Sequence, residues 1–301
     1  MIQRTLITGI SGFTGRYVAT LLRERGHDVC GLGQFDESPN ERMYVCDLSD
    51  AQRVLEVVRL VQPTHVVHLA AISFVAHDDV AEVYKTNIIG TRNLLAALAS
   101  LDTKPKKVLL ASSANIYGNV ELSSIDERVT PCPNNDYAVS KYAMEGMARL
   151  WFDKLPIIII TRPFNYTGVG QSGNFIIPKI VNHFRNGSLA IELGNIDVDR
   201  DFTDVRTVAS VYADLLECDA ISGEIFNVCA GKTVSLRNVI EAMEGIAGYD
   251  IEVKVNQAFV RENEIKRLCG SNEKLVKAIG KLDEFSLKAT LKWMYETDAP
   301  V

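Results

Sequence analysis

Three side chains in this sequence could together protonate the oxygen of a carbonyl group as it is reduced: Ser113, Tyr137 and Lys141. Tyr137 and Lys141 are four residues apart in a helical pattern, so they lie on one helix face. A phenol, whose pKa is about 10, exchanges protons poorly at neutral pH, and a neighbouring ammonium favours its ionised form. Ser113 follows an apolar strand and offers a second hydroxyl that can stabilise alkoxide charge. These residues form a candidate catalytic set for hydride transfer at an alcohol or a ketone.

A tyrosine and a lysine at this spacing also occur as an exposed surface pair, but a glycine-rich loop near the amino terminus favours the catalytic interpretation. The loop follows the predicted strand 5–8 and opens the predicted helix 15–25. Residues without a Cβ let the backbone approach a pyrophosphate, and the helix amino terminus supplies partial positive charge. This placement predicts a dinucleotide site rather than a purely structural turn. The predicted cofactor contacts in the loop are Gly9, Ser11, Gly12, Phe13, Thr14 and Gly15.

The end of the second predicted strand bears on the type of dinucleotide. An acid there would bind the ribose 2′-hydroxyl of NAD and would repel a 2′-phosphate. The stretch 29–34 ends in Gly33 and Gln34, so no acid stands at that position. NADP(H) is therefore favoured and NAD(H) is possible, with Arg42 as the one arginine nearby that could hold a 2′-phosphate.

The third predicted strand is followed by a candidate adenine contact. Asp47 and Leu48 come directly after that strand, at the ligand edge of the sheet, where a carboxylate and a backbone N–H can bind the adenine. The alternative for Asp47 is a helix N-cap, for which Ser49 and Asp50 compete. We expect the adenine contact.

Apolar, β-branched runs alternate with helical patterns through most of the first half of the chain. The runs 5–8, 65–69, 107–111 and 157–161 are mainly apolar and do not alternate with polar residues, which is typical of strands covered on both faces. This order predicts an α/β fold with a Rossmann-type, doubly wound parallel sheet. Ligands of such sheets bind at the carboxyl ends of the strands.

We expect a domain boundary near residue 162, because the sequence there changes to a Gly- and Asn-rich loop. Residues 1–162 form the predicted dinucleotide-binding domain. Residues 163–301 form mainly a smaller carboxyl-terminal α/β lobe for the substrate. Helix 204–217 and strand 224–229 are expected to return to the main sheet.

Composition and charge narrow the class of partner. The chain has 301 residues, 47% of them hydrophobic, and a formal net charge of -6. This charge, without an extended Lys/Arg cluster, argues against nucleic acid or an anionic membrane as the partner. The amino terminus enters a strand pattern at once and the run 157–160 is too short to span a bilayer, so a cytoplasmic protein is expected. The six cysteines lack metal-type spacing, so no metal site is predicted.

Taken together, these motifs resemble the extended short-chain dehydrogenase/reductase family, and within it the members that modify nucleotide sugars. The stretches that carry the likeness are 68–71, 86–91, 162–165, 200–205 and 227–229. The further cofactor contacts that the resemblance implies are Leu69, Ala70, Ala71, Asn87 and Phe164, together with Tyr137 and Lys141. It also implies a homodimer formed through the helix that bears Tyr137 and the helix before it.

Residues that the family's other reactions require are missing from this sequence. Dehydratases of the family carry a glutamate at the position of Asn115, and an amide cannot move the proton that expels water. Combined epimerase-reductases carry a cysteine in the segment of Ser113, and none is present there. Reduction of a 4-keto sugar and 4-epimerisation with tightly bound NAD both stay open. The missing acid after the second strand favours reduction.

The later stretches resemble family reductases that convert GDP-4-keto-6-deoxy-D-mannose to GDP-D-rhamnose. The substrate contacts that this likeness implies are Ser73, Ser113, Asn115, Asn165, Lys179, Arg200, Arg261 and Glu264. Alternatively, Arg200 and Asp201 could brace the two lobes through a salt bridge, and Arg261 could lie in a solvated loop. A non-catalytic, NADP-sensing regulatory protein is a further alternative, although such proteins typically lose the tyrosine and lysine that this chain retains.

Overall fold

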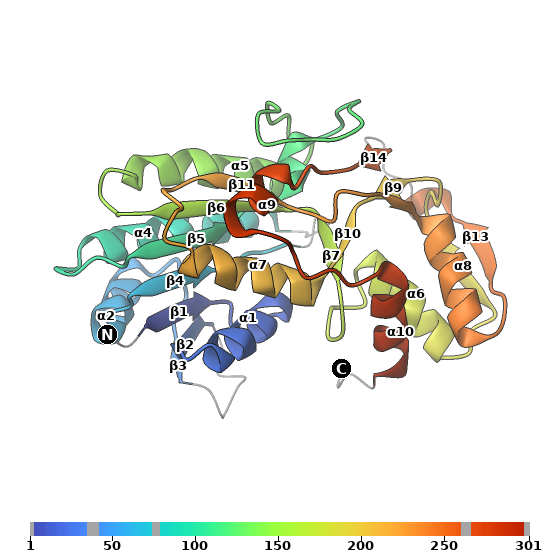
Figure 1. Ribbon diagram of the computed structural model, residues 1–301, viewed down its shortest axis with the longest axis horizontal. Helices are drawn as coiled ribbons and strands as arrows, with labels where there is room; N and C mark the ends of the chain where they lie inside the picture. Colours follow the sequence, from blue (N-terminus) through green and yellow to red (C-terminus); the bar gives the residue numbers. More distant parts are fainter. Residues whose placement is uncertain (1–2, 35–41, 74–78, 260–265, 298–301) are drawn as a thin grey trace.

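A seven-stranded parallel sheet forms the main lobe in the computed structural model, which describes residues 3–34, 42–73, 79–259 and 266–297 (Figure 1). The strands in spatial order are β11 (Ile225–Val228), β6 (Ile158–Pro163), β5 (Lys107–Ala111), β4 (His65–His68), β1 (Arg4–Thr8), β2 (Asp28–Gly33) and β3 (Met43–Val45). The order reverses between β1 and β4, so the ligand crevice is expected at the carboxyl ends of those strands. The predicted Rossmann-type α/β fold is confirmed.

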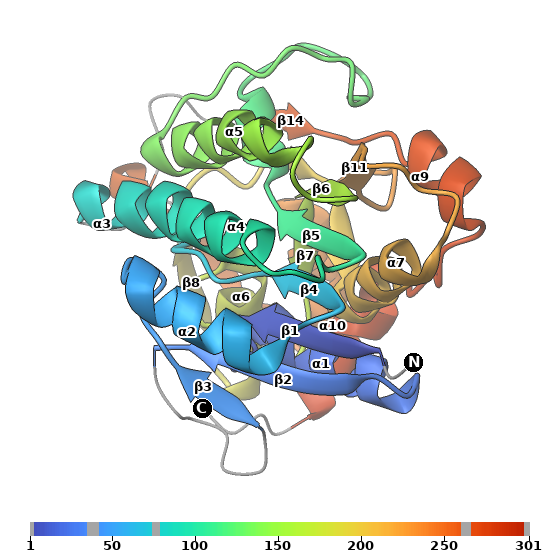
Figure 2. The ribbon, with the colours of Figure 1, turned by 90° about the vertical axis from the view of Figure 1, so that its left-hand side faces the viewer.

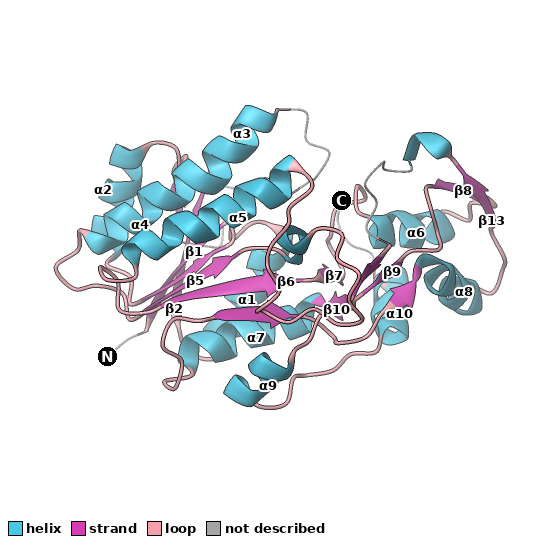
Figure 3. Cartoon of the chain, turned by 90° about the horizontal axis from the view of Figure 1, so that it is seen from above, coloured by secondary structure: helices cyan, strands magenta, loops and turns pink. Residues whose placement is uncertain are grey.

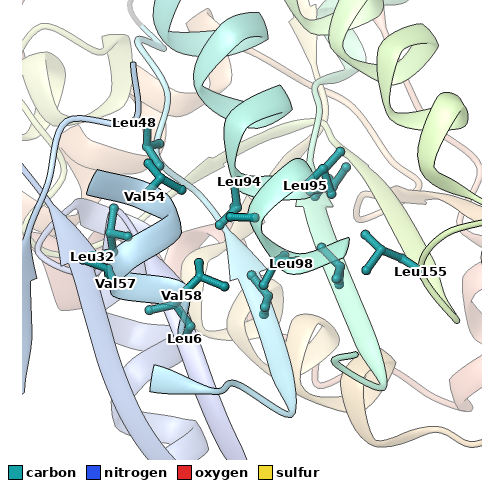
Figure 4. Close-up of a cluster of buried hydrophobic side chains, with 14 of the residues drawn as sticks. Leu6, Leu32, Leu48, Val54, Val57, Val58, Leu94, Leu95, Leu98 and Leu155 are labelled. Carbon is teal, nitrogen blue, oxygen red and sulfur yellow. The ribbon is translucent and has the colours of Figure 1, made fainter. Parts of the chain in front are cut away.

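Helices cover both faces of this sheet (Figure 2). The helices on one face are α2 (Ala51–Val61), α4 (Thr91–Ala99) and α5 (Asp136–Ala148), and those on the other are α1 (Phe13–Glu24) and α7 (Val205–Glu217). Leu6 packs into the core under α2 and α4 (Figure 4), whereas its neighbour Ile7 packs under α1 and α7. Because successive strand residues point to opposite faces, both faces need apolar residues and the strand sequence is apolar throughout.

The helical segment 80–99, which precedes α5 in the chain, is interrupted by a π-helical segment. It consists of α3 (Val80–Tyr84), the π-helix η1 (Lys85–Gly90) and α4. A π turn accommodates an extra residue and is frequent at functional sites. Here the π segment contains Asn87, whose side chain is buried. The 3₁₀ helices η2 (Ala114–Tyr117) and η3 (Arg149–Trp151) follow β5 and α5 respectively.

A smaller lobe lies where the main strands point (Figure 3). Its helices α6 (Ile176–Arg185), α8 (Leu236–Ala247) and α10 (Leu287–Glu296) share one apolar core. Its short strands are β7 (Asn165–Thr167) with β10 (Phe202–Asp204), β8 (Ala190–Leu193) with β13 (Glu252–Val255), and β9 (Asp199–Arg200) between β12 (Val234–Ser235) and β14 (Arg267–Leu268). The remaining helical elements are η4 (Gln257–Phe259) and α9 (Glu273–Ile279).

Helix α7 connects the two lobes. Its N-cap, Asp204, also accepts a 2.7 Å hydrogen bond from Thr290 Oγ1 in α10. Arg206 lies between the rings of Phe285 and Trp293, 3.9 Å from each centroid, and pairs with Asp204. Helix α10 is thereby held against the main lobe. Within the part of the chain that the structure describes, no helix is both long enough and apolar enough to cross a membrane.

Candidate active site

The glycine-rich loop forms a cradle that a side chain would fill. Gly9 has a φ of 71°, and a Cβ there would lie 2.9 Å from the backbone nitrogen of Ala70. A Cβ on Gly15 would overlap the carbonyl oxygen of Gly9. Gly12 is the N-cap of α1 and supplies no capping side chain, and the first turn of that helix contains no acid. The loop and the helix terminus therefore fit the pyrophosphate of a dinucleotide.

The loop after β4 is held by a chain of buried hydrogen bonds. Ala70 donates its N–H to Thr8 Oγ1 (3.2 Å), and His68 bonds Thr8 Oγ1 through Nδ1 and Thr91 Oγ1 through Nε2, both at 2.7 Å. Burial, assisted by the charge of Lys141, lowers the pKa of His68 to about 3. His68 is therefore neutral and positions the backbone of the predicted contacts Leu69, Ala70 and Ala71.

Asn87 braces the same loop. Its Oδ1 accepts from the N–H of Ile72 (3.0 Å), and its Nδ2 donates to the carbonyl of Ile72 (3.1 Å) and to Ser140 Oγ (3.0 Å). The sequence-based prediction placed Asn87 at the cofactor. The structure instead uses its amide to tie the loop after β4 to α5.

Gln34 and Asp47 lie side by side at the ends of β2 and β3. The side chain of Gln34 hydrogen-bonds to Asp47, and Asp47 Oδ1 accepts the N–H of Ser49 at 2.8 Å. That backbone bond holds the pKa of the Asp47 carboxyl below its usual value. Asp50 is the N-cap of α2, accepting from the N–H of Arg53, so the N-cap alternative for Asp47 is wrong. The adenine contact stays a prediction.

The side chain of Arg42 extends toward the opposite end of β2. Its Nη1 is 3.4 Å from Oδ1 of Asp28, which begins that strand, whereas Gly33 ends it. The β2–β3 register pairs Gly31 with Met43, the residue after Arg42. Arg42 is therefore remote from the edge where a 2′-phosphate would bind.

The structure brings the three predicted catalytic residues together. Ser113 follows β5, and its side chain hydrogen-bonds to Tyr137 on α5. Ser113 Oγ also accepts the N–H of Asn115 (3.2 Å). Lys141 donates from Nζ to the carbonyl of Ala111 at 2.7 Å, so it spans from α5 to the end of β5.

Burial sets the protonation states of this set. Burial raises the pKa of Tyr137 well above its usual value, and the hydrogen bond from Ser113 opposes that shift only in part. Burial lowers the pKa of Lys141 to about 8, although the carboxylate of Glu145 raises it. At neutral pH the site thus holds a protonated phenol and an ammonium, which is the state that can deliver a proton.

A buried ion pair that the sequence analysis missed lies behind the catalytic helix. Arg162 on β6 donates from Nε and Nη2 to the two oxygens of Glu145 on α5, at 2.9 and 2.7 Å. Both side chains are at most 3% exposed. Arg162 Nη1 also donates to the hydroxyl of Tyr117 (2.9 Å), which donates to Asn227 Oδ1 (2.8 Å). Two signals were available: Glu145 is four residues from Lys141, and Arg162 lies within an apolar strand.

The side chain of Phe164, a predicted cofactor contact, packs in the protein core. Its ring is buried in a core cluster, 6.2 Å from the ring centroid of Tyr117. A Cβ on Gly270 would lie 2.7 Å from the same ring, so Gly270 makes room for it. The N–H of Phe164 donates to the carbonyl of Val228. The side chain therefore packs under the site, and any cofactor contact would come from the backbone.

Asn165 carries an unsatisfied donor in the smaller lobe. Its Nδ2 is buried, and among the residues described it has no hydrogen-bond partner. Burying such a donor without a partner is costly, so ligand oxygens are its natural partners. Among the predicted substrate contacts that the structure describes, Asn165 is the one with a buried side-chain donor that lacks a partner.

Lys179 lines a cavity of about 390 Å³ that is formed by α6, β8, β13 and η4. Its Nζ donates to the carbonyl of Glu192 (2.8 Å) and lies 4.8 Å above the ring of Phe259. Glu192 and Lys254 also line this cavity, so it has polar groups of both charges around an aromatic ring. Such a space suits a planar, polar ligand group.

Arg200 and Asp201 do not pair with each other. Arg200 Nη1 donates to the carbonyl of Asp199 (3.0 Å), whereas the carboxylate of Asp201 accepts the N–H groups of Ala230 (2.8 Å) and Gly231 (2.9 Å). Burial raises the pKa of Asp201 to about 6 against these bonds. The salt-bridge alternative is therefore wrong, because Asp201 anchors a loop instead.

The structure describes some of the other predicted substrate contacts. Ser73 is exposed after the loop that follows β4. Asn115 lies in η2 beside Ser113. Arg261 and Glu264 lie outside the described residues.

Comparison with known proteins covers both lobes. The family model described as GDP-mannose 4,6 dehydratase matches residues 6–294. A GDP-6-deoxy-D-talose 4-dehydrogenase from Aggregatibacter actinomycetemcomitans is 35% identical and covers 98% of this chain and 97% of its own length. A GDP-6-deoxy-D-mannose reductase from Pseudomonas aeruginosa is 33% identical, with 97% of this chain and 96% of that protein covered.

Solved structures agree in fold over the same length. A candidate epimerase from Burkholderia cenocepacia is 48% identical with a TM-score of 0.92, covering 98% of this chain and 97% of that chain. RMD from Pseudomonas aeruginosa, solved with NADPH, is 31% identical with a TM-score of 0.84 and the same coverage. The UDP-glucose 4-epimerase of Thermus thermophilus, solved with NAD, is 25% identical with a TM-score of 0.87, covering 97% of this chain and 98% of that chain.

Proposed function

This chain belongs to the GDP-mannose 4,6-dehydratase family of extended short-chain dehydrogenases/reductases, and from that premise we propose that it reduces the 4-keto group of a GDP-linked 4-keto-6-deoxy sugar. It is an NAD(P)-dependent oxidoreductase, as its relatives are. The proposed reaction converts GDP-4-keto-6-deoxy-D-mannose to GDP-D-rhamnose, with NADPH favoured and NADH also accepted.

The observation that carries this proposal is the intact proton-donating set next to Asn115. Ser113, Tyr137 and Lys141 are together, so the groups for hydride transfer are present. Asn115 is the second residue of η2, whose N-cap is Ser113, and the family's dehydratases have their glutamate at this position. An amide can neither give up nor take up the proton that water elimination requires. The site thus supports redox chemistry at C4 without dehydration.

The proposal also specifies the configuration of the product at C4. D-Talose and D-mannose differ only in their configuration at C4. Reduction of one 4-keto sugar can therefore give either product, and the names of two relatives contain one of these sugars each. The hydride must reach one face of the ketone, and that face depends on how the sugar lies over the nicotinamide. We assign the manno configuration because the later stretches of the chain resemble the reductases that form it.

A nicotinamide, when bound at the glycine-rich loop, would supply the hydride for C4 of the sugar. Tyr137, kept protonated by burial, donates its proton to the C4 oxygen as negative charge develops there. Ser113 donates its hydroxyl proton in a hydrogen bond to the same oxygen, while its Oγ accepts the N–H of Asn115. Lys141 is held by Ala111 at the rear of the site and favours the phenolate that remains.

The cavity beside Lys179 supports a nucleotide as the second ligand. Phe259 offers a ring on which a base can stack, and Glu192 offers a carboxylate that can accept the N–H groups of guanine. These features favour a GDP-sugar over a sugar without a base. Asn165 would contact the sugar or its phosphates, since its Nδ2 lacks a partner among the described residues.

The neutral side chain at the end of β2 leads to a prediction on cofactor choice. Gln34→Asp is expected to reduce kcat/KM with NADPH by about tenfold or more, because a carboxylate there repels a 2′-phosphate, while kcat/KM with NADH is kept or rises. Steady-state rates with the two cofactors measure the change. Gln34→Asn is the matched control, and an unchanged NADPH-to-NADH ratio in Gln34→Asp would contradict the assignment of this position.

The proposed function is tested with purified protein, GDP-4-keto-6-deoxy-D-mannose and either NADPH or NADH. We expect oxidation of one cofactor per sugar reduced, and a product whose large H3–H4 coupling in the NMR spectrum marks the manno configuration. A small coupling would give the talo epimer and correct the stereochemistry. Protein that retains NAD through purification and interconverts 4-epimers without net cofactor oxidation would instead be an epimerase. Absence of turnover with any 4-keto nucleotide sugar would indicate a regulatory protein.

We also propose that two copies associate through α3, η1 and α5. Large apolar side chains are exposed on this surface: Val80, Ile89, Val139 and Tyr142. An exposed apolar surface of this kind marks an interaction site, and the homodimer that the family resemblance implies would cover it. The mass in solution, measured by light scattering, is expected to be that of a dimer, and a monomeric mass would contradict this.

A further inference from the structure

Strand β7 contributes one residue to each of the two candidate ligand sites. Asn165 and Tyr166 are successive in this strand, so their side chains point to opposite sides of it. The Nδ2 of Asn165 is buried and has no hydrogen-bond partner in the part of the chain that the structure describes. We expect it to bind an oxygen of the substrate. Tyr166 reaches the main lobe. The strand itself is only three residues long and pairs with β10.

Tyr166 contacts the first turn of α1, where the cofactor pyrophosphate is expected. Its hydroxyl is 2.8 Å from Thr14 Oγ1, and its ring is stacked on Phe13 with centroids 6.0 Å apart and planes 10° apart. Phe13 and Thr14 are the first two residues of α1, directly after the N-cap Gly12. A residue of the smaller lobe thus fixes the backbone that presents N–H groups to a phosphate.

We propose that Tyr166 is a positioning residue that couples the binding of the sugar nucleotide to the binding of the dinucleotide. A ligand oxygen on Asn165 restrains β7, the restrained strand holds the ring and hydroxyl of Tyr166, and these hold the first turn of α1 in the geometry that binds phosphate. The inference rests on the proposed function, because it takes the two ligands to be a GDP-sugar and NADPH.

Thermodynamic linkage makes the coupling reciprocal. If GDP strengthens the binding of NADPH by some factor, NADPH must strengthen the binding of GDP by the same factor. The hydroxyl of Tyr166 carries the coupling only if its removal reduces both factors together. A purely structural tyrosine would lower stability without changing them.

Tyr166→Phe removes the hydroxyl and keeps the ring that stacks on Phe13. We expect the Kd of NADPH, measured by fluorescence titration of the full chain, to rise about fivefold, the effect of one buried hydrogen bond. We also expect the factor by which saturating GDP lowers this Kd to fall toward one. Thr14→Val should have the same effect, and the double variant should add little because both changes remove one bond.

Tyr17→Phe is the matched control. Tyr17 also joins α1 to the smaller lobe, but its hydroxyl donates to the carbonyl of Val169 (2.7 Å) rather than to the first turn. It should leave the effect of GDP on NADPH binding unchanged. Melting temperatures of all variants separate a change in coupling from a loss of fold.

The outcomes distinguish this inference from the function on which it rests. Wild-type protein that binds NADPH and GDP while Tyr166→Phe keeps the same coupling factor overturns the inference alone. An equal loss of coupling in Tyr17→Phe also overturns it, because any contact between the lobes would then suffice. Wild-type protein that binds no nicotinamide dinucleotide overturns the proposed function and the inference together.

Discussion

Tyr137→Phe is expected to lower kcat for reduction of the 4-keto sugar by about 10³-fold while the Kd of NADPH changes by less than about twofold. In the proposed mechanism the phenol transfers its proton to the C4 oxygen, whereas Ser113 only donates a hydrogen bond to it. Its ring is retained in the variant, so the packing of α5 over the site is retained as well. Stopped-flow or steady-state rates and a fluorescence titration measure the two quantities.

Two further variants sharpen this test. Ser113→Ala removes a hydrogen-bond donor but no transferred proton, so its loss of kcat should be smaller, about 10²-fold. The control is Lys288→Gln, at an exposed position of α10 in the smaller lobe, which should leave kcat unaltered. Turnover in Tyr137→Phe within tenfold of wild type would show that another group, or solvent, delivers the proton.

Glu145→Gln is expected to lower the free energy of unfolding by about 3 kcal/mol, because it leaves the guanidinium of Arg162 buried without its charge partner. The same change removes the charge that raises the pKa of Lys141, so that pKa should fall below its value of about 8. Lys141 acts in its charged form, which is lost as pH rises through its pKa. The alkaline limb of the kcat/KM profile should therefore move to lower pH.

Chemical denaturation and pH profiles measure the two effects separately. Glu241→Gln, at an exposed position of α8, is the control and should change neither. A loss of stability with an unmoved alkaline limb would show that Glu145 supports the fold without influencing Lys141. A loss below about 1 kcal/mol would contradict the structural role itself.

Much of this architecture could be predicted from the sequence because it depends on local patterns. Strands buried on both faces must be apolar throughout, and those stretches mark the parallel sheet. The spacing of Tyr137 and Lys141 fixes their common face once the segment is helical. The glycine at position 9 needs a positive φ, which glycine adopts at little cost. In each case the cause and the residue lie within a few positions of each other.

The rest could not be predicted because it depends on partners far away in the chain. Asn87 has a binding-type side chain, but its partners Ile72 and Ser140 are 15 and 53 residues away. The sequence allows a salt bridge between Asp201 and its neighbour Arg200 as an alternative, whereas Asp201 accepts hydrogen bonds from backbone groups near residue 230. A polar side chain can be identified in the sequence, but its hydrogen-bond partner is determined by the fold.

Because the start of α1 has no side-chain cap, we expect binding of the cofactor to stabilise the folded protein. Gly12 provides no side chain to the first turn, so a phosphate is the natural partner for those N–H groups. A ligand that binds only the folded state at about a hundred times its Kd adds about 2.7 kcal/mol to stability. Cellular proteases act on opened molecules, so the abundance of this chain should follow the supply of its reductant.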